Sequence, residues 1–181
     1  QVLRHELEAY GAIFQSTSDS EVIIHLIAHS RADTLLARII DALSQVRGAF
    51  SIVLQTDEGV IAVRDPHGFR PLCLGRLGDT YLVASETCAF DLLGAEVVRE
   101  IEPGELVLLN DKGLTSYMPF APVSPAMCVF EYVYFARPDS KIFGATAVYG
   151  TRKALGRQLA KESPVPADIV IPVPDSGVPA S

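Results

Sequence analysis

Hydrophobic residues recur with helical spacing through the first 46 residues of the chain. A short amphipathic segment over 2–10 predicts a helix that ends at Gly11, the residue type that most often follows a helix. A second helix is predicted after Ser18, because Ser18 and Glu21 have the spacing of a capping box. A third is predicted over 32–46, where leucines and isoleucines return every three or four positions.

From Gly48 onwards the hydrophobic period shortens to that of strands. Turn-forming Gly, Pro, Asp and Asn separate the β-like runs, and one short helix over 86–93, closed by Gly94, interrupts them. The runs cover residues 48–55, 59–65, 71–77, 80–86, 96–101, 105–110 and 114–118. This pattern predicts an antiparallel, hairpin-rich sheet structure that follows the three helices.

A proline-rich segment over 118–126 separates this region from a different pattern. Beyond it we expect a strand over 129–136, a helix over 146–162, a strand over 167–173 and a turn into a further helix. Strand, helix and strand at this spacing indicate a βαβ unit of a parallel sheet. We therefore predict two domains, 1–121 and 125–181, in a chain of mixed α+β and α/β class.

Composition and charge narrow the class of protein. A 49% hydrophobic and 20% charged composition is that of a globular protein. The net charge of -7 argues against nucleic acid as a partner, and no apolar run is long enough to predict a membrane span. The three cysteines form neither a disulfide framework nor a CxxC metal motif, so we expect a reducing, cytoplasmic location.

The last turn of the chain carries candidate chemistry. Asp175, Ser176 and Gly177 follow an apolar run, and ligands of open parallel sheets bind at the carboxyl ends of strands. Carboxylate and hydroxyl oxygens there suit Mg²⁺ or a phosphorylated substrate. The alternative is that these residues only turn the chain and cap the next helix.

Four stretches together resemble the glutamine phosphoribosylpyrophosphate amidotransferase (amidophosphoribosyltransferase) family. They are "TSDSEVI", "VRDPHGFRPLCLG" with "YLVASETCAFD", "CVFEYVYFARPDS" and "ADIVIPVPDSGVPA". The resemblance is collinear over the chain, and "EYVYFARPDS" is its most specific part. It implies that 1–121 is the C-terminal portion of an αββα N-terminal-nucleophile glutaminase sandwich. It also implies that 125–181 is the first βαβ portion of a type I phosphoribosyltransferase sheet.

The resemblance implies an activity as well. Enzymes of this family transfer the amide nitrogen of glutamine to phosphoribosyl pyrophosphate, giving 5-phosphoribosylamine, glutamate and pyrophosphate, the first step of purine synthesis. The family nucleophile is a cysteine at the mature N-terminus, activated as a thiolate. All three cysteines here are internal, so we expect no catalytic residue in this chain, an internal fragment that is inactive alone. The resemblance further implies a homotetramer inhibited by purine nucleotides.

Single residues take roles from the same resemblance. Asp19 matches the aspartate that pairs with the α-ammonium of glutamine; the alternative is a first-turn helix acid. Ser176 matches a Mg²⁺ ligand beside the pyrophosphate. Cys128 matches a cysteine that ligates a [4Fe–4S] cluster in some members, and the alternative is a small buried hydrophobe. We assign Cys73 and Cys88 to core packing.

The "RDPHGFRPL" stretch contains an acid–base cluster of Arg64, Asp65, His67 and Arg70, which we interpret as a structural hairpin. The basic residues of 152–161 fit a solvated helix face, with a phosphate-facing patch as the alternative. Asparagine-synthetase-like glutaminases carry similar turns. Two other functions therefore stay open: the glutaminase half of such an enzyme, and a catalytically silent relative.

Overall fold

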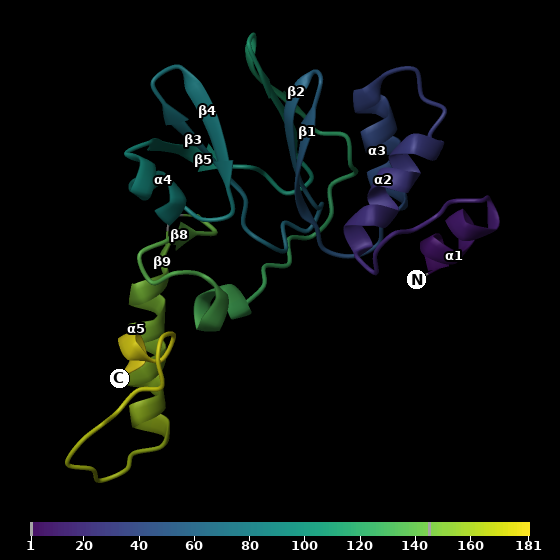
Figure 1. Ribbon diagram of the computed structural model, residues 1–181. Coiled ribbons are helices and arrows are strands. Elements are labelled where there is room, and N and C mark those ends of the chain that lie inside the picture. Colours follow the sequence, from purple (N-terminus) through teal and green to yellow (C-terminus); the bar gives the residue numbers. More distant parts are fainter. Residues whose placement is uncertain (1, 145) are drawn as a thin grey trace. The chain divides into compact units, whose positions relative to one another are not determined.

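The computed structural model describes residues 2–144 and 146–181. The chain divides into two compact units, one up to Gly48 and one from Ala49 onwards, and Figure 1 shows the helices and strands of each. The predicted boundary between 1–121 and 125–181 separates two chemical functions, which a division by compactness does not test. That boundary stays a prediction.

The first unit is helical, as predicted. Its helices are α1 (Val2–Ala9), α2 (Asp19–His29) and α3 (Leu35–Gln45). Gly11 ends the first segment with a φ of 93°, a value that a side chain would strain. Thr34 caps α3, because its hydroxyl accepts a hydrogen bond from the Ala37 amide at 3.2 Å. Leu7, Leu26 and Ala42, one from each helix, form the buried centre.

The second unit contains two antiparallel sheets, formed by the seven strands that the sequence predicts. One sheet has the order β1–β2–β6–β7 and the other β4–β3–β5. The strands are β1 (Ser51–Thr56), β2 (Gly59–Arg64), β3 (Cys73–Leu77), β4 (Thr80–Ala84), β5 (Glu96–Glu100), β6 (Leu106–Asn110) and β7 (Gly113–Tyr117). The predicted short helix is α4 (Cys88–Leu93), ended by Gly94 in a left-handed conformation.

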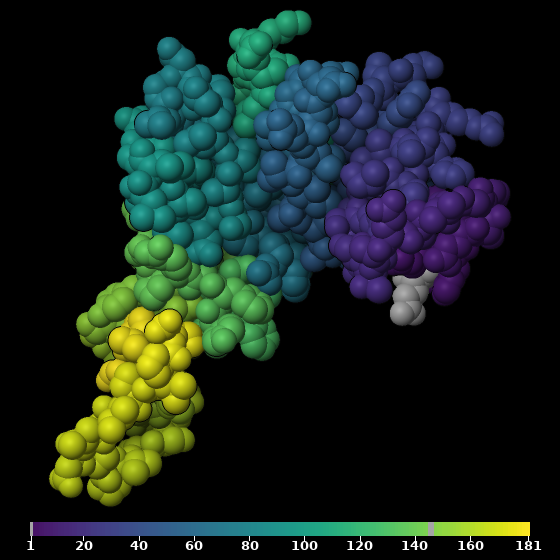
Figure 2. All heavy atoms as spheres, in the orientation of Figure 1, coloured from purple at the N-terminus to yellow at the C-terminus, as the bar shows by residue number. Residues whose placement is uncertain are grey.

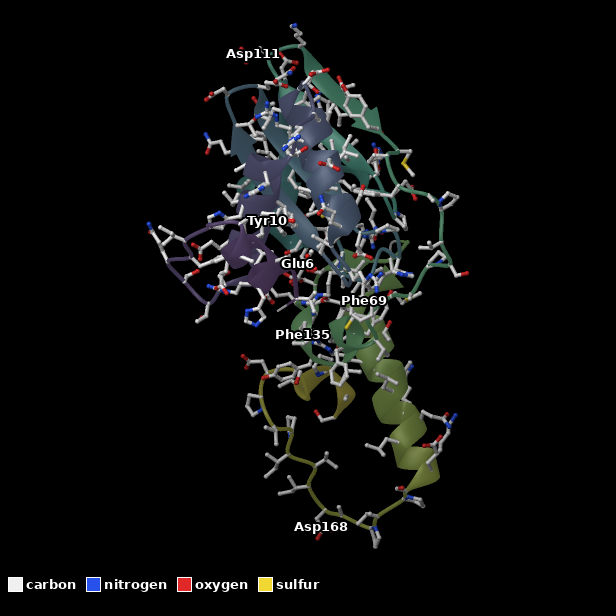
Figure 3. The ribbon with its side chains drawn as sticks, turned by 90° about the vertical axis from the view of Figure 1, so that its right-hand side faces the viewer. Glu6, Tyr10, Phe69, Asp111, Phe135 and Asp168 are labelled. Atoms are coloured by element: carbon white, nitrogen blue, oxygen red, sulfur yellow. The ribbon has the colours of Figure 1, made fainter. Side chains whose placement is uncertain are left out.

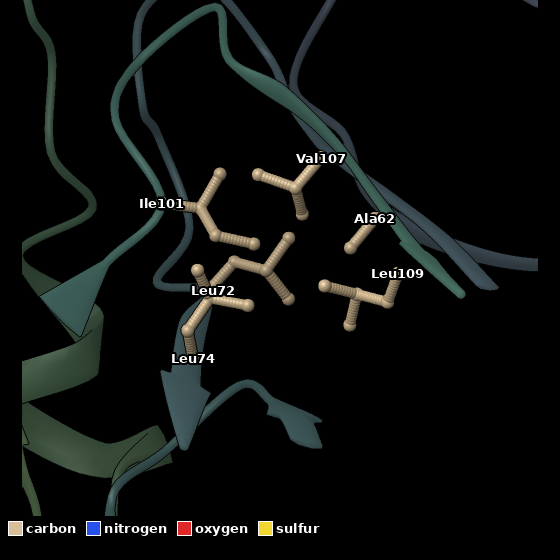
Figure 4. Close-up of a cluster of buried hydrophobic side chains, with 6 residues drawn as sticks. All are labelled: Ala62, Leu72, Leu74, Ile101, Val107 and Leu109. Carbon is tan, nitrogen blue, oxygen red and sulfur yellow. The ribbon is translucent and has the colours of Figure 1, made fainter. Parts of the chain in front are cut away.

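One apolar cluster joins the two sheets (Figure 4). Ala62 and Val107 are register partners on neighbouring strands of the larger sheet, and Leu74 comes from the smaller one. Leu72, Ile101 and Leu109 complete the cluster, and all six side chains are buried. Burying each leucine or isoleucine stabilises the fold by about 1.5–3 kcal/mol, so this cluster holds the sheets together.

The prediction of a strand over 129–136 is wrong. The segment contains a π-helical turn, η1 (Glu131–Phe135), in which the Ala136 amide donates to the Glu131 carbonyl at 3.1 Å. Apolar residues at consecutive positions fit a buried strand and a helical turn equally well, so the pattern did not decide. A short hairpin follows, which the sequence did not predict. Its strands, each two residues long, are β8 (Lys141–Ile142) and β9 (Thr146–Ala147).

The last part of the unit contains α5 (Val148–Glu162), as predicted, and a short 3-10 helix, η2 (Val178–Ala180). The strand expected over 167–173 is not formed: this segment is irregular, with a bend at Asp168, and pairs with no strand in the described part of the chain. Its apolar side chains are exposed, Ile171 by 83%, in the yellow surface of Figure 2. A strand forms only where a neighbour satisfies its backbone groups, and none does so here.

The helices of the described ranges include none with the length and hydrophobicity that crossing a bilayer requires.

Candidate functional site

The loop before α2 presents Asp19 to solvent. Asp19 is the first residue of α2, its side chain is exposed, and it makes no hydrogen bond or ion pair with any described residue. An unpaired carboxylate in this position is available to a cationic group of a ligand. The structure is therefore compatible with the role that the resemblance gives Asp19, and the role itself stays a prediction.

The prediction that Ser18 and Glu21 form a capping box is wrong, because neither makes the contacts that a capping box requires. The Ser18 hydroxyl lies 2.6 Å from the Ser20 hydroxyl and caps no helix amide. Glu21 instead accepts hydrogen bonds from the amides of Gln15 and Ser16, at 2.7 and 2.8 Å, and from the Ser16 hydroxyl. These bonds, that from the Gln15 amide foremost, lower the pKa of Glu21 to about 2. Glu21 thus fixes the loop that leads to Asp19.

The "RDPHGFR" loop is structural, as predicted, but it is not a hairpin: it contains a tight turn, closed by the Gly68 amide on the Asp65 carbonyl at 2.9 Å, and joins β2 to β3, which belong to different sheets. Asp65 is fully buried, and its carboxylate accepts hydrogen bonds from the amides of His67, Phe69 and Phe50 at 2.9, 3.2 and 3.3 Å. Gly68 has a φ of 62°, and a Cβ there would lie 2.7 Å from the Pro103 ring. With its oxygens committed to backbone amides, Asp65 shapes the loop and has no free lone pair directed to a substrate.

Arg64 holds the same loop from the other side. Its guanidinium is buried and donates to the carbonyl oxygens of Ile101, Arg70 and Gly68 at 2.6, 2.9 and 3.0 Å. It also lies 3.4 Å from the Glu100 carboxylate. Since Arg64 ends β2 of the larger sheet and Ile101 follows β5 of the smaller one, Arg64 links the two sheets where they approach the loop.

The proline-rich segment attaches to this loop. The amides of Ala126 and Cys128 donate to the carbonyl oxygens of His67 and Phe69 at 3.0 and 2.9 Å. His67 Nδ1 lies 3.1 Å from the Ser124 carbonyl oxygen. The chain therefore passes from the sheets to the "EYVYFARPDS" stretch along the outside of the "RDPHGFR" loop.

Arg70 makes the next contact with that stretch. Its Nε lies 2.5 Å from Glu131 Oε1, and its guanidinium lies 4.5 Å from the centre of the Phe135 ring. Figure 3 labels Phe135 and Phe69, the residue before Arg70. Glu131 is buried, and burial raises its pKa although Arg70 acts in the opposite direction. The buried carboxylate is stabilised as an anion only while Arg70 stays in place.

Glu86, which follows β4, holds the end of the same stretch. Its Oε2 accepts hydrogen bonds from the Arg137 amide and from the fully buried Ser140 hydroxyl, both at 2.7 Å. The neighbouring Thr87 hydroxyl accepts from the Lys141 amide at 2.9 Å. Two of the stretches that carry the family resemblance, "YLVASETCAFD" and "EYVYFARPDS", are thus bonded to each other through Glu86.

Arg152 of α5 fixes the π-helical turn. It donates to the carbonyl oxygens of Tyr132 and Ala136, both at 2.7 Å, and burial lowers its pKa. The interpretation of Arg152 as part of a solvated or phosphate-facing surface is wrong, because its side chain is buried. The sequence missed the structural roles of Arg152, Glu131 and Glu86. A charged residue inside an apolar or aromatic run, as in "FEYVYF", could have indicated a buried structural role.

Ser176 lies in the turn that leads into η2. The Val178 amide donates to the Asp175 carbonyl at 3.3 Å, and the Ala180 amide to the Gly177 carbonyl at 3.0 Å. Asp175 is exposed and Ser176 is half-buried. One hydroxyl and one exposed carboxylate fit a Mg²⁺ site whose other oxygens come from phosphate and water. The described residues hold no group of three His, Cys, Asp or Glu side chains placed to bind a metal.

The three cysteines are free and buried. Burial raises the pKa of Cys73 to about 12, and its thiol donates to the Ala84 carbonyl at 3.1 Å. Burial agrees with the core roles assigned to Cys73 and Cys88 and with the hydrophobic alternative for Cys128. A [4Fe–4S] cluster needs four thiolates, so the cysteines of this chain do not by themselves fit one.

Known proteins resemble the chain throughout. An amidophosphoribosyltransferase of Bacillus subtilis is 47% identical over 179 residues, which cover 99% of this chain and 37% of the relative. One of Rhizobium etli is 48% identical, with the same coverage. A chloroplastic amidophosphoribosyltransferase of Arabidopsis thaliana is 47% identical and is covered to 32%. The chain therefore spans about a third of the length of these relatives.

Solved structures show a similarity to the same enzymes. The glutamine phosphoribosylpyrophosphate amidotransferase of Bacillus subtilis, complexed with ADP and GMP, superposes with a TM-score of 0.94 at 47% identity, covering 99% of this chain and 39% of that one. A family model described as a glutamine amidotransferase domain matches residues 1–91. The chain thus belongs to the glutamine amidotransferase domain family, and along nearly its whole length it is similar to amidophosphoribosyltransferases.

Proposed function

We propose that this chain forms part of an amidophosphoribosyltransferase that makes 5-phosphoribosylamine from glutamine and phosphoribosyl pyrophosphate. The observation that carries the proposal is the 47% identity over 99% of the chain, which includes both the Asp19 loop and the "EYVYFARPDS" stretch. A glutaminase of another class would share the sheets but would have no reason to share the segment beyond the proline-rich joint. The TM-score of 0.94 supports the same conclusion at the level of the fold.

Asp19 would bind the α-ammonium group of glutamine in this reaction. Its carboxylate is exposed and unpaired among the described residues, and Glu21 holds the preceding loop. A charge-assisted hydrogen bond from the ammonium would orient the amide towards the cysteine nucleophile of the complete enzyme. Attack on the amide carbon gives an acyl-enzyme and releases ammonia, and water then releases glutamate.

Ser176 would act in the second half of the reaction. We assign residues 125–181 to the start of a type I phosphoribosyltransferase sheet, with the 167–173 segment as a strand that pairs in the complete enzyme. Ser176 would then be one ligand of a Mg²⁺ ion that neutralises charge on the departing pyrophosphate. Ammonia would attack the anomeric carbon as the bond to pyrophosphate breaks.

Further properties of the complete enzyme follow from its relatives. We expect a homotetramer in the cytoplasm or, as the chloroplastic relatives illustrate, in a plastid. Purine nucleotides are expected ligands, since the Bacillus subtilis relative is complexed with ADP and GMP. An iron–sulfur cluster would require Cys128 and three thiolates that this chain does not supply.

The test uses the complete gene product that contains this sequence. Asp19→Asn should raise the KM for glutamine about 10- to 100-fold, the effect of losing a charge-assisted hydrogen bond of about 1.5–3 kcal/mol. Activity with ammonia in place of glutamine should stay unchanged, because ammonia bypasses the glutamine site. Asp33→Asn, in the exposed α2–α3 loop, is the matched control.

Three results would contradict the proposal. Release of glutamate without release of pyrophosphate from phosphoribosyl pyrophosphate would exclude the transferase activity and favour another glutamine-dependent enzyme. Equal losses of glutamine- and ammonia-dependent activity in Asp19→Asn would show that Asp19 supports the fold and does not bind glutamine. A protein with neither activity would be a silent relative.

A further inference from the structure

We infer that Gly156, in the middle of α5, is a positioning residue for the turn that carries Ser176. The inference rests on the proposed function, because it concerns how that turn binds Mg²⁺ and phosphoribosyl pyrophosphate. It assigns a role to a helix residue that touches neither the metal nor the substrate. Its basis is the close approach of two backbones.

The backbone of η2 lies directly on α5 at Gly156. A Cβ atom on Gly156 would overlap the carbonyl oxygen of Ala180 and lie 2.7 and 2.8 Å from the Ala180 carbonyl carbon and Cα. Real Cβ atoms essentially never approach other atoms so closely, and these atoms are backbone. A flexible side chain could rotate away, but here a methyl group would force η2 off the helix.

The Ser176 turn and η2 would move together. Hydrogen bonds from the Val178 amide to the Asp175 carbonyl and from the Ala180 amide to the Gly177 carbonyl join them into one unit. A Cβ on Gly177 would lie 2.7 Å from the Val173 carbonyl oxygen, so the turn also fits closely against the segment that precedes it. Displacing Ala180 therefore displaces the Ser176 hydroxyl.

The same helix contains a natural control. Gly150 also lies in α5, and a Cβ there would have no atom within 4 Å. Alanine is the better helix former, so Gly150→Ala should leave the fold intact or stabilise it. Two chemically identical substitutions six positions apart, in the same helix, thus differ only in whether a methyl group meets η2.

The experiment compares Gly156→Ala and Gly150→Ala in the complete gene product with glutamine, ammonia, Mg²⁺ and phosphoribosyl pyrophosphate. Gly156→Ala should raise the KM for phosphoribosyl pyrophosphate and the Mg²⁺ concentration for half-maximal activity on the order of 10- to 100-fold. Hydrolysis of glutamine, which does not use the turn, should be retained and reports that the protein is folded. Gly150→Ala should match the wild type in every measurement.

Hydrogen exchange of the Val178 and Ala180 amides separates the outcomes. Faster exchange in Gly156→Ala together with the raised KM supports the inference. Faster exchange with an unchanged KM overturns it, because the contact would then be structural only. Unchanged exchange and KM also overturn it. A wild-type protein that does not consume phosphoribosyl pyrophosphate overturns the proposed function and this inference with it, a result distinct from the other three.

Discussion

Glu86→Ala tests whether the stretch "YLVASETCAFD" holds the "EYVYFARPDS" stretch in place. Glu86 Oε2 accepts hydrogen bonds from the Arg137 amide and the Ser140 hydroxyl, both at 2.7 Å. Truncation to alanine removes the acceptor of both hydrogen bonds and leaves the backbone of β4 unchanged. We expect local opening of residues 137–141 to become easier, without global unfolding.

The magnitude follows from the burial of the two donors. The Ser140 hydroxyl is fully buried, and leaving it without an acceptor costs about 1–3 kcal/mol. The Arg137 amide lies nearer to solvent and contributes at most ~1 kcal/mol, because water replaces Glu86 there. A total of about 2–3 kcal/mol corresponds to roughly 30- to 150-fold faster exchange through local opening.

The assay is hydrogen exchange followed by mass spectrometry on peptides that cover 137–144 of the complete gene product. Glu86→Gln is the matched variant: its amide oxygen still accepts a hydrogen bond, so exchange should rise by less than about tenfold. Glu58→Ala, in the exposed β1–β2 turn, controls for the loss of one negative charge. Exchange in Glu86→Ala within a factor of three of the wild type would refute the reasoning.

Two further predictions concern single charged groups. Arg64→Met should destabilise the protein by about 3–5 kcal/mol, because three buried carbonyl oxygens lose their donor, and Arg64→Lys should restore part of this; urea unfolding measures both. The folded-state pKa of Glu21 lies below its ordinary value, so its contribution to stability is complete above pH 4.5 and is lost as the pH falls towards 2. The carboxyl carbon of Glu21 should titrate by NMR with a midpoint near 2, and a midpoint near 4.5 would contradict the hydrogen bonds to Gln15 and Ser16.

The sequence determined most of the local structure. The three helices before Gly48, the seven strands and α5 occur where periodicity and turn residues predict them. In these elements the spacing of the hydrophobic residues fits only one regular structure. Elsewhere a glycine marks the end of an element because a positive φ is required there, as at Gly11 and Gly94. The tight turn of the "RDPHGFR" loop was also predictable, because Asp, Pro and Gly each favour a particular turn position, but not that this turn joins two different sheets.

The sequence did not determine the segments whose conformation depends on distant partners. The "EYVYF" run forms a π-helical turn because Arg152 binds its carbonyl oxygens and Arg70 binds Glu131. The 167–173 segment has the composition of a strand, but no described strand lies beside it to complete its hydrogen bonds.

The residues of the candidate site also fall into two groups: those that the sequence indicated and those that only the fold reveals. The roles of Asp19 and Ser176 were predicted from a resemblance to a known family, which short motifs in the sequence carry. The hydrogen bonds of Glu86 and the contact at Gly156 join residues far apart in sequence, and only the folded chain brings those atoms together. Local preferences thus determined where the elements lie, while the tertiary structure decided which of them hold the site in place, because distant contacts leave no periodic pattern in the sequence.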